Sequence, residues 1–429
     1  MRILFLTHYF HPEGNAPASR AYANCRRWAK LGHQVDVITS APNVPNGVVY
    51  EGYRNRICRT GLIDGVRVTR VWTYLAANRG LARRIGNYLS YMASATLAGM
   101  AARRPDVVIA TSPQFFNGWA GVVLSRLRRI PFVLEIRDMW PDSIVALEGL
   151  KNQRLLRILY GLEDRMYRAA DHIVTVGEGY QRDLRDKGVA RRRISIIPNG
   201  VDKELFSPGE PGRAAVEKYC LKGGFTCAYV GTIGMACGLD VVLDAAGRLR
   251  QAGRHDVRFL LVGDGARREE LQQQALAEGL DNVVFTGRVA REQVPEILAA
   301  VNGCFVHLRK ADLFKRVLPS KIFEMAAMRK PIILGVEGCA AELLREAGGG
   351  ICIEPDNAGQ LVAAVKQLAG DPSLGRSLGN SGHRYVMEHY DRDTLARDYL
   401  EVLARITRGE QPQGREQKHE DSQLRRRAA

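Results

Sequence analysis

The residues best placed to do chemistry stand together in one short segment, residues 317–334. Pro319 and Ser320 can open a helix, whose first turn leaves backbone N–H groups and the positive end of the helix dipole facing an anion. Lys321 adds a full positive charge there. Glu324, one turn further on, is a carboxylate that can accept hydrogen bonds from two neighbouring hydroxyls, as on a ribose. The segment therefore predicts an anion site and a sugar-hydroxyl site on one helix.

The residues after this helix indicate where it should lie. Lys330 and Pro331 stop it, and residues 332–334 read as the next buried strand. The start of the helix is therefore expected in a crevice at the carboxyl ends of parallel strands, where α/β proteins bind ligands. Taken alone, the same residues fit an ordinary helix with Lys321 and Glu324 in solvent equally well.

Apolar runs of strand length alternate with helical patterns along the chain, which predicts α/β structure with parallel sheets. In the first half the predicted strands are residues 2–7, 34–40, 66–72, 107–111, 132–136, 172–176 and 194–197. In the second half they are residues 226–230, 259–262, 283–285, 303–306, 332–334 and 350–353. This alternation predicts two doubly wound domains.

Asn-Gly and three prolines accumulate within residues 198–211, which marks the linker. We predict a first domain over residues 1–200 and a second domain over residues 201–383. Residues 384–407 are predicted to be terminal helices, and residues 408–429 a disordered tail rich in Gln, Glu and Arg. A length of 429 residues with 46% hydrophobic content is enough for two cores.

Four further motifs precede the 317–334 segment: Asn199-Gly-Val-Asp202, Ala228-Tyr-Val-Gly231, Phe259-Leu-Leu-Val-Gly-Asp-Gly265 and Val284-Phe-Thr-Gly-Arg-Val289. In this order and spacing the motifs resemble those of retaining glycosyltransferases of family 4, and the resemblance covers about residues 1–405. It implies the GT-B fold, in which two Rossmann-like domains face a central cleft and the C-terminal helix crosses back to the first domain. It also implies that the second domain binds a nucleotide-sugar donor.

The resemblance assigns each part of the donor to a structural element. The diphosphate is expected at a glycine turn and at the helix start, the ribose at Glu324, and the base at backbone groups that follow a strand. The donor-binding residues implied in this domain are Gly231, Gly234, Gly287, Arg288, Val289, Ser320, Lys321 and Glu324.

Two departures from the family's pattern affect the expected chemistry. The first of the two glutamates that the family often carries is replaced by Arg316. The basic residues that often follow the glycine turn are replaced by Met235-Ala-Cys-Gly238. The diphosphate charge must then be met by Lys321, Arg309 or Lys315. Because no Asp-x-Asp is placed to hold a metal between the diphosphate and the enzyme, we expect a metal-independent reaction without a cofactor.

In the first domain, residues 8–20 are predicted to form the loop between the first strand and its helix, above the sheet. Gly14 permits a close backbone approach, and Arg20 can make bidentate contacts to phosphate. The spacing resembles the family's glycine-containing loop near the donor diphosphate, although the paired glycines are missing. A polar surface loop is the alternative.

A second polar segment, Glu135-Ile-Arg-Asp-Met-Trp-Pro-Asp-Ser143, follows another predicted strand. Its charged residues and tryptophan are too polar for a core, so a cleft is expected. The segment resembles the branch of family 4 that includes O-antigen N-acetylfucosaminyl transferases and colanic-acid glycosyltransferases. Many relatives have a sugar-contacting histidine near position 137 or 138. We therefore assign Arg137 and Asp138 to catalysis, with Asp138 contacting the transferred sugar or the acceptor hydroxyl, and Glu135 and Trp140 to acceptor binding.

Positive charge is concentrated in the first half of the chain. Residues 1–200 contain 30 Lys and Arg against 15 Asp and Glu, whereas the remaining 229 residues contain 32 against 31. An anionic partner is therefore expected. No zinc-knuckle, RNP-type or helix-turn-helix pattern supports nucleic acid, so an anionic membrane surface or a phosphorylated lipid fits better. Eight cysteines without a C-x-x-C pair indicate reduced thiols in the cytosol.

Residues 85–102 contain no charged residue and are bracketed by arginines. Their glycines and polar residues make the run too weakly hydrophobic for a spanning helix. We expect a helix packed inside the first domain, with the arginines binding lipid phosphates and the protein peripheral at the cytoplasmic face of the inner membrane. These arginines are Arg79, Arg83, Arg84, Arg103 and Arg104.

The residues and the resemblance together imply retaining transfer of a sugar from a UDP-sugar to a polyprenyl-diphosphate-linked acceptor in surface polysaccharide synthesis. The sugar would be an N-acetylated hexosamine or deoxyhexosamine. Charge develops on the leaving diphosphate, where Lys321 would stabilise it. Two alternatives stay open, an enzyme like UDP-N-acetylglucosamine 2-epimerase and a non-catalytic assembly scaffold.

Overall fold

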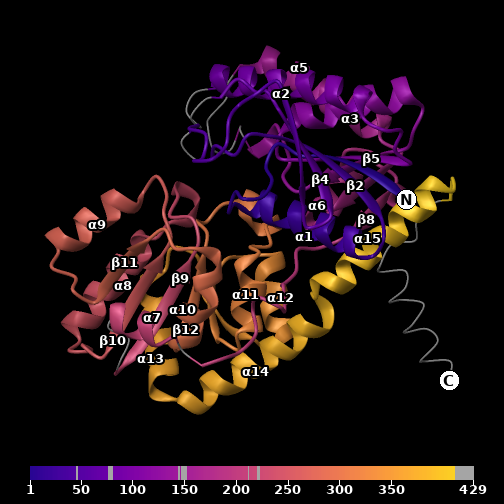
Figure 1. Ribbon diagram of the computed structural model, residues 1–429. Coiled ribbons are helices and arrows are strands. Elements are labelled where there is room, and N and C mark those ends of the chain that lie inside the picture. The colour runs from indigo at the N-terminus through magenta and orange to yellow at the C-terminus, as the bar shows by residue number, and fades with distance from the viewer. Residues whose placement is uncertain are drawn as a thin grey trace, which may run out of the picture. The chain divides into compact units, whose positions relative to one another are not determined.

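The structure is a computed structural model that describes residues 1–44, 47–75, 81–143, 145, 152–210, 212–219 and 223–410. The chain forms two compact units (Figure 1). Unit 1 comprises Met1–Pro198 with Asp393–Ala429, and unit 2 comprises Asn199–Arg392. The predicted limits at residues 200 and 383 therefore move to 198 and 392, and position 383 falls inside a continuous helix. Most of the predicted tail, from residue 411 onward, lies outside the described residues.

The sheet of unit 1 has the strand order β3-β4-β2-β1-β5-β6-β7-β8, and its pairs are parallel except for β3 with β4. The predicted strands are present, and β3 is an addition. Its side chains are mostly exposed, so no buried apolar run marked it in the sequence. The strands are β1 (Arg2–Leu6), β2 (Gln34–Ser40), β3 (Cys58–Ile63), β4 (Val66–Val71), β5 (Val107–Thr111), β6 (Phe132–Ile136), β7 (His172–Thr175) and β8 (Ile194–Ile196).

Helices cover both faces of this sheet, as a doubly wound fold requires. One apolar core lies between the sheet and α2, α3, α5 and α6, and the other lies between the sheet and α1 and α15. The helices are α1 (Ala16–Lys30), α2 (Leu81–Ala101), α3 (Phe115–Arg128), α5 (Gln153–Ala169), α6 (Glu178–Asp186) and α15 (Arg392–Thr407).

The last helix, α15, belongs to the core of unit 1 although it follows unit 2 in the chain. The indole N–H of Trp28 donates to the Ala396 carbonyl at 3.1 Å, and Tyr399 packs edge-on against the Trp28 ring at 5.1 Å between centroids. Arg27 forms an ion pair with Asp393 at 2.5 Å. The chain therefore returns to unit 1, as the GT-B resemblance implies.

The sheet of unit 2 is entirely parallel, in the order β11-β10-β9-β12-β13-β14. Parallel strands connected by helices are buried on both faces, and this explains the near-continuous apolar runs of the sequence. The strands are β9 (Phe225–Val230), β10 (Val257–Val262), β11 (Val283–Gly287), β12 (Gly303–His307), β13 (Ile332–Gly335) and β14 (Gly350–Cys352).

The helices of unit 2 enclose its sheet from two sides. Helices α8, α9 and α13 share a core with one face, and α10, α11, α12 and α14 share a core with the other. The α-helices are α7 (Arg213–Lys218), α8 (Asp240–Gln251), α9 (Arg268–Ala277), α10 (Val294–Ala300), α11 (Lys321–Ala327), α12 (Cys339–Ala347), α13 (Ala358–Gly370) and α14 (Pro372–His389). Short 3₁₀ turns are η1 (Arg191–Arg193), η2 (Met235–Cys237), η3 (Arg291–Gln293) and η4 (Asp312–Arg316).

Candidate active site

Two glycine turns meet at the carboxyl ends of β9 and β10 in unit 2. The Gly231 N–H donates to the Val262 carbonyl at 2.9 Å. A Cβ atom at Gly263 would lie 1.9 Å from the Gly231 carbonyl oxygen, so only glycine fits there. Both glycines have positive φ, 145° at Gly231 and 138° at Gly263. The two turns therefore present backbone, without side chains, at this edge of the sheet.

The turns at Gly231 and Gly263 are called the glycine edge below. The ammonium group of Lys321, the first residue of α11, lies beside it. Its Nζ is 3.8 Å from the centroid of the Tyr229 ring, and a Cβ at Gly231 would come within 2.8 Å of it. Within the part of the chain that the structure describes, Nζ has no hydrogen-bond or ion-pair partner. Burial lowers the pKa of Lys321 to about 8. Gly231 and Lys321 therefore lie side by side, as the sequence predicted.

The N-terminus of α11 lacks the capping hydrogen bond that was expected from Ser320. Ser320 stands at the cap position, but its side chain makes no capping hydrogen bond, and the helix has only 7 residues. The positive charge at this place therefore comes mainly from Lys321.

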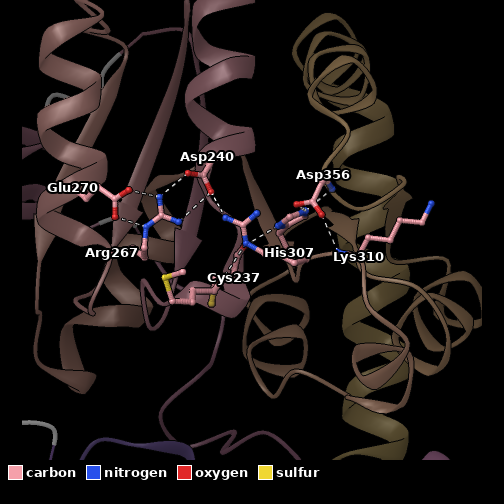
Figure 2. A network of polar contacts seen from close by, with 9 residues as sticks. Cys237, Asp240, Arg267, Glu270, His307, Lys310 and Asp356 are labelled. Atoms are coloured by element: carbon pink, nitrogen blue, oxygen red, sulfur yellow. Dashed lines mark hydrogen bonds and ion pairs between the residues drawn. The ribbon is translucent and has the colours of Figure 1, made fainter. Parts of the chain in front are cut away.

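A polar network fixes the turn that follows Gly234, as Figure 2 shows. Arg309 donates to the Met235 carbonyl at 3.0 Å and to Asp240 at 2.6 Å. Asp240 also accepts from Arg267, which in turn pairs with Glu270. Arg309, predicted as a replacement diphosphate ligand, is thus part of the support for the turn.

His307, at the end of β12, holds the same turn from the other side (Figure 2). Its Nδ1 lies 2.7 Å from the Cys237 carbonyl oxygen, and its Nε2 accepts from the Asp356 N–H at 2.8 Å. Burial lowers the pKa of His307, so the ring is neutral with its proton on Nδ1. His307 was not among the residues predicted from the sequence. Its position, a polar residue at the end of an apolar strand, could have indicated it.

Glu324 is held by a partner that the sequence did not suggest. Arg291 Nη2 donates to Glu324 Oε1 at 2.9 Å, and the Arg291 guanidinium lies over the Phe206 ring. The second carboxylate oxygen of Glu324 has no hydrogen-bond partner in the described ranges. The carboxylate is therefore oriented and keeps acceptor capacity for a hydroxyl.

The residues proposed to bind a base are the last residue of β11, Gly287, and the two residues after it, Arg288 and Val289. Gly287 has φ of 69°, and its carbonyl accepts from the Gly263 N–H at 3.1 Å, which joins it to the glycine edge. Arg288 is exposed, and Val289 packs against the unit 2 core.

Lys315 is paired with Asp312 at 2.8 Å and is exposed. Of the three cations considered for the diphosphate, only Lys321 adjoins the glycine edge.

In unit 1, Arg20 was predicted to bind the donor phosphate and Glu135 to bind the acceptor, but the two side chains contact each other. Helix α1 begins at Ala16, so Arg20 lies inside it and points into the protein. Its guanidinium donates to Glu135 at 3.4 Å and to the carbonyls of Ile197 and Pro198 at 2.7 Å. Glu135 is 1% exposed. These two residues tie β6 to the end of β8, which corrects their assignment to phosphate and acceptor.

Trp140 is also part of the core of unit 1. It is 5% exposed, and its ring stacks on Phe115 with 4.4 Å between centroids. The expectation that this aromatic residue lies in an open cleft is therefore wrong, because the apolar area of its ring is buried against α3. Gly14, by contrast, is exposed in the loop before α1.

Arg137 and Asp138 remain at the carboxyl end of β6 and are partly exposed. Both of their backbone N–H groups donate to Ser112 Oγ, at 2.7 and 3.2 Å. Burial lowers the pKa of Arg137 to about 10 and raises the pKa of Asp138. Ser112, which organises this turn, was absent from the predicted site.

The predicted membrane residues lie at the ends of α2. Arg83, Arg103 and Arg104 are exposed, Arg84 Nη2 donates to the Tyr88 hydroxyl at 3.4 Å, and Arg79 lies outside the described residues. None of the described helices is both long and apolar enough to cross a membrane. The described residues also contain no group of three His, Cys, Asp or Glu side chains that could hold a metal ion.

Two family models match the chain. The model described as Glycosyl transferase 4-like domain matches residues 15–200, and the model described as Glycosyl transferases group 1 matches residues 220–385. A curated relative is the putative colanic acid biosynthesis glycosyl transferase WcaI of Escherichia coli, 26% identical over 87% of this chain and 92% of its own. The O-antigen chain mannosyltransferase C of Escherichia coli is 24% identical over 60% of this chain and 67% of its own.

Solved structures share the fold at low identity. Sucrose-phosphate synthase from Thermosynechococcus elongatus has a TM-score of 0.75 with 16% identity, covering 95% of this chain and 99% of its own. Anabaena HepE in complex with UDP-glucose has a TM-score of 0.69 with 18% identity, covering 94% and 99%. With two doubly wound units and the two matching domain models in sequence, this chain belongs to the GT-B glycosyltransferases.

Proposed function

We propose that this protein transfers a sugar from a UDP-sugar, with retention and without a metal ion, to a polyprenyl-diphosphate-linked acceptor in surface polysaccharide synthesis. The observation that carries the donor assignment is the unpaired ammonium of Lys321 beside the Gly231 backbone. UDP as the nucleotide is supported by HepE, whose structures contain UDP and UDP-glucose. The relatives named for colanic acid and O-antigen support the pathway.

The proposed mechanism relies on charge at the leaving group. As the bond between sugar and diphosphate breaks, negative charge grows on the diphosphate, and Lys321 stabilises it more in the transition state than in the ground state. Glu324 accepts from the ribose hydroxyls while Arg291 fixes its orientation. The acceptor hydroxyl attacks on the face from which the nucleotide leaves and gives its proton to the departing diphosphate oxygen. The sugar therefore keeps its configuration without an enzyme nucleophile.

The sugar and the acceptor are proposed from resemblance. The Glu135–Ser143 segment supports the branch of O-antigen N-acetylfucosaminyl transferases and colanic-acid glycosyltransferases, and hence an N-acetylated hexosamine or deoxyhexosamine. The excess of basic residues within residues 1–200 supports a phosphorylated lipid as the acceptor carrier.

A transfer assay tests the proposal. Purified full-length protein is incubated with a panel of radiolabelled UDP-sugars and a membrane lipid extract, with Lys321→Ala as the control. Labelled product in the lipid phase supports transfer. Isomerised sugar in the aqueous phase would instead identify an epimerase, and the absence of both, despite UDP binding, would identify a scaffold.

We also propose peripheral attachment to the cytoplasmic face of the membrane. Along α2, Leu89, Leu97 and Met100 are 44%, 73% and 42% exposed, at helical spacing, and Arg103 and Arg104 follow at its end. An apolar stripe beside cations suits the surface of an anionic bilayer. Each basic residue near such a surface contributes about 1 kcal/mol at low salt.

Liposome sedimentation tests the attachment. Wild-type protein should sediment with anionic liposomes at low salt, leave them as salt rises, and ignore neutral liposomes. Changing Arg83, Arg103 and Arg104 to Gln should reduce sedimentation. The charge-matched control changes the exposed Arg54, Arg56 and Arg59 to Gln. Equal losses in both triple variants, or retention through high salt and carbonate, would contradict a local electrostatic contact at α2.

A further inference from the structure

The guanidinium of Arg137 in unit 1 has two nitrogen atoms, Nε and Nη1, that no group in the described ranges of the chain pairs with. Both of these nitrogen atoms are buried. A buried donor without a partner destabilises the folded state, and the cost is larger when the group is charged. Buried polar groups are satisfied in most proteins, so such an exception points to a ligand or a catalytic role.

The carboxylates near Arg137 are already used by other groups. Glu135 accepts from Arg20 through Oε2 and from the Thr111 hydroxyl through Oε1, the latter at 2.8 Å. The Asp138 carboxylate is hydrogen-bonded to Ser143 and to the Met139 backbone. Neither carboxylate accepts a hydrogen bond from Nε or Nη1 of Arg137. The positive charge of Arg20 also lies close to the Arg137 guanidinium.

The backbone around Arg137 is held in place before any ligand binds. Ser112 Oγ accepts from the N–H groups of Arg137 and Asp138, and the stack of Trp140 on Phe115 anchors the following residues. Because Ser112 Oγ is the acceptor in both bonds, its own O–H remains available as a donor. The turn lies at the carboxyl end of β6, the edge at which parallel α/β sheets bind ligands.

We propose that Arg137, together with the Ser112 hydroxyl, binds a phosphate group of a substrate in unit 1. A guanidinium presents its donors in a fixed fork that matches the oxygens of phosphate. The excess of 30 Lys and Arg over 15 Asp and Glu in residues 1–200 attracts such an anion to this unit. The inference rests on the proposed function only for the source of the phosphate, which is either the nucleotide or the lipid-linked acceptor.

Calorimetry on the full chain tests the site, with inorganic pyrophosphate, UDP and farnesyl diphosphate as probes. The measurements use a Lys321→Ala background, so that the anion site proposed in unit 2 does not contribute. Arg137→Gln should weaken pyrophosphate binding by about ten- to a hundredfold, the loss of charge-assisted hydrogen bonds. A parallel loss for UDP assigns the site to the donor, and a parallel loss for farnesyl diphosphate assigns it to the lipid.

Two controls keep the test decisive. Arg59→Gln makes the same charge change at an exposed position and should leave all three affinities within about twofold. Arg137→Met should melt at the same or a higher temperature than the parent, because it removes an unpaired buried charge. Unchanged pyrophosphate binding in Arg137→Gln, or a marked loss of thermal stability in Arg137→Met, would overturn the proposal. Neither readout requires sugar transfer, so failure of the proposed function gives a different pattern.

Discussion

The carboxyl edges of the two sheets use similar residue types for different purposes. In unit 2, Lys321 lies beside Gly231, and its ammonium has no hydrogen-bond or ion-pair partner among the residues that the structure describes. In unit 1, the guanidinium of Arg20 donates hydrogen bonds to Glu135 and to two backbone carbonyls. A charged residue near the end of a parallel strand can therefore either keep its charge beside exposed backbone or hold two parts of the fold together.

The neighbouring backbone decides between these roles. At Gly231 the absence of a side chain leaves room for the Lys321 ammonium. At Arg20 the carbonyls of Ile197 and Pro198, just after β8, need donors in a buried place, and the guanidinium supplies them. The two places are therefore distinguished by their backbone, which is glycine beside Lys321 and buried carbonyl groups beside Arg20.

The largest expected effect is on the stability of unit 1. Arg20→Ala leaves the buried Glu135 carboxylate and two carbonyls without their donor, which should cost about 3–5 kcal/mol of unfolding free energy. Chemical denaturation measures this loss, and UDP affinity under native conditions should change by less than about twofold. A stable Arg20→Ala variant with weakened UDP binding would restore Arg20 as a phosphate ligand.

The next effect is on catalysis in unit 2. Lys321→Ala should lower kcat by about 100- to 1000-fold, because one fixed cation is lost where charge develops. The donor KM should rise much less. Steady-state kinetics with the accepted UDP-sugar measure both values, and Lys321→Arg should recover part of kcat. If kcat is unchanged in Lys321→Ala, the leaving-group charge is met by another residue.

A smaller effect is expected at the ribose. Glu324→Ala should weaken UDP binding by about 1–3 kcal/mol, since a charged acceptor is removed from the ribose hydroxyls. The loss should shrink for 2′-deoxy-UDP, which has one hydroxyl fewer to offer. Calorimetry with both nucleotides on folded variants makes the comparison. Equal affinities of wild type and variant for UDP would leave the Glu324–Arg291 pair with a structural role only.

Most strands could be predicted from apolar runs in the sequence, because a parallel strand that is buried on both faces carries apolar side chains on both. Strand β3 escaped prediction because its side chains face solvent. Within the site, Lys321 and Glu324 could be predicted together because they are neighbours on α11. The approach of Lys321 to Gly231 was implied by the family resemblance, because the two residues are distant in sequence. Arg20 and Glu135 are 115 residues apart, and Arg291 and Glu324 are 33 apart. No local pattern reports such pairings.

The claim that unit 2 binds the donor diphosphate through Lys321 is tested most directly by the pH dependence of UDP affinity. With a pKa lowered to about 8, Lys321 is charged at pH 7 and largely neutral at pH 9. UDP should therefore bind about tenfold more weakly at pH 9, the change expected when only the charged form binds well. The Lys321→Arg variant stays charged at both pH values. Its UDP affinity should therefore fall only by the amount that titration of the uracil ring causes. Identical pH profiles for wild type and Lys321→Arg would contradict the assignment.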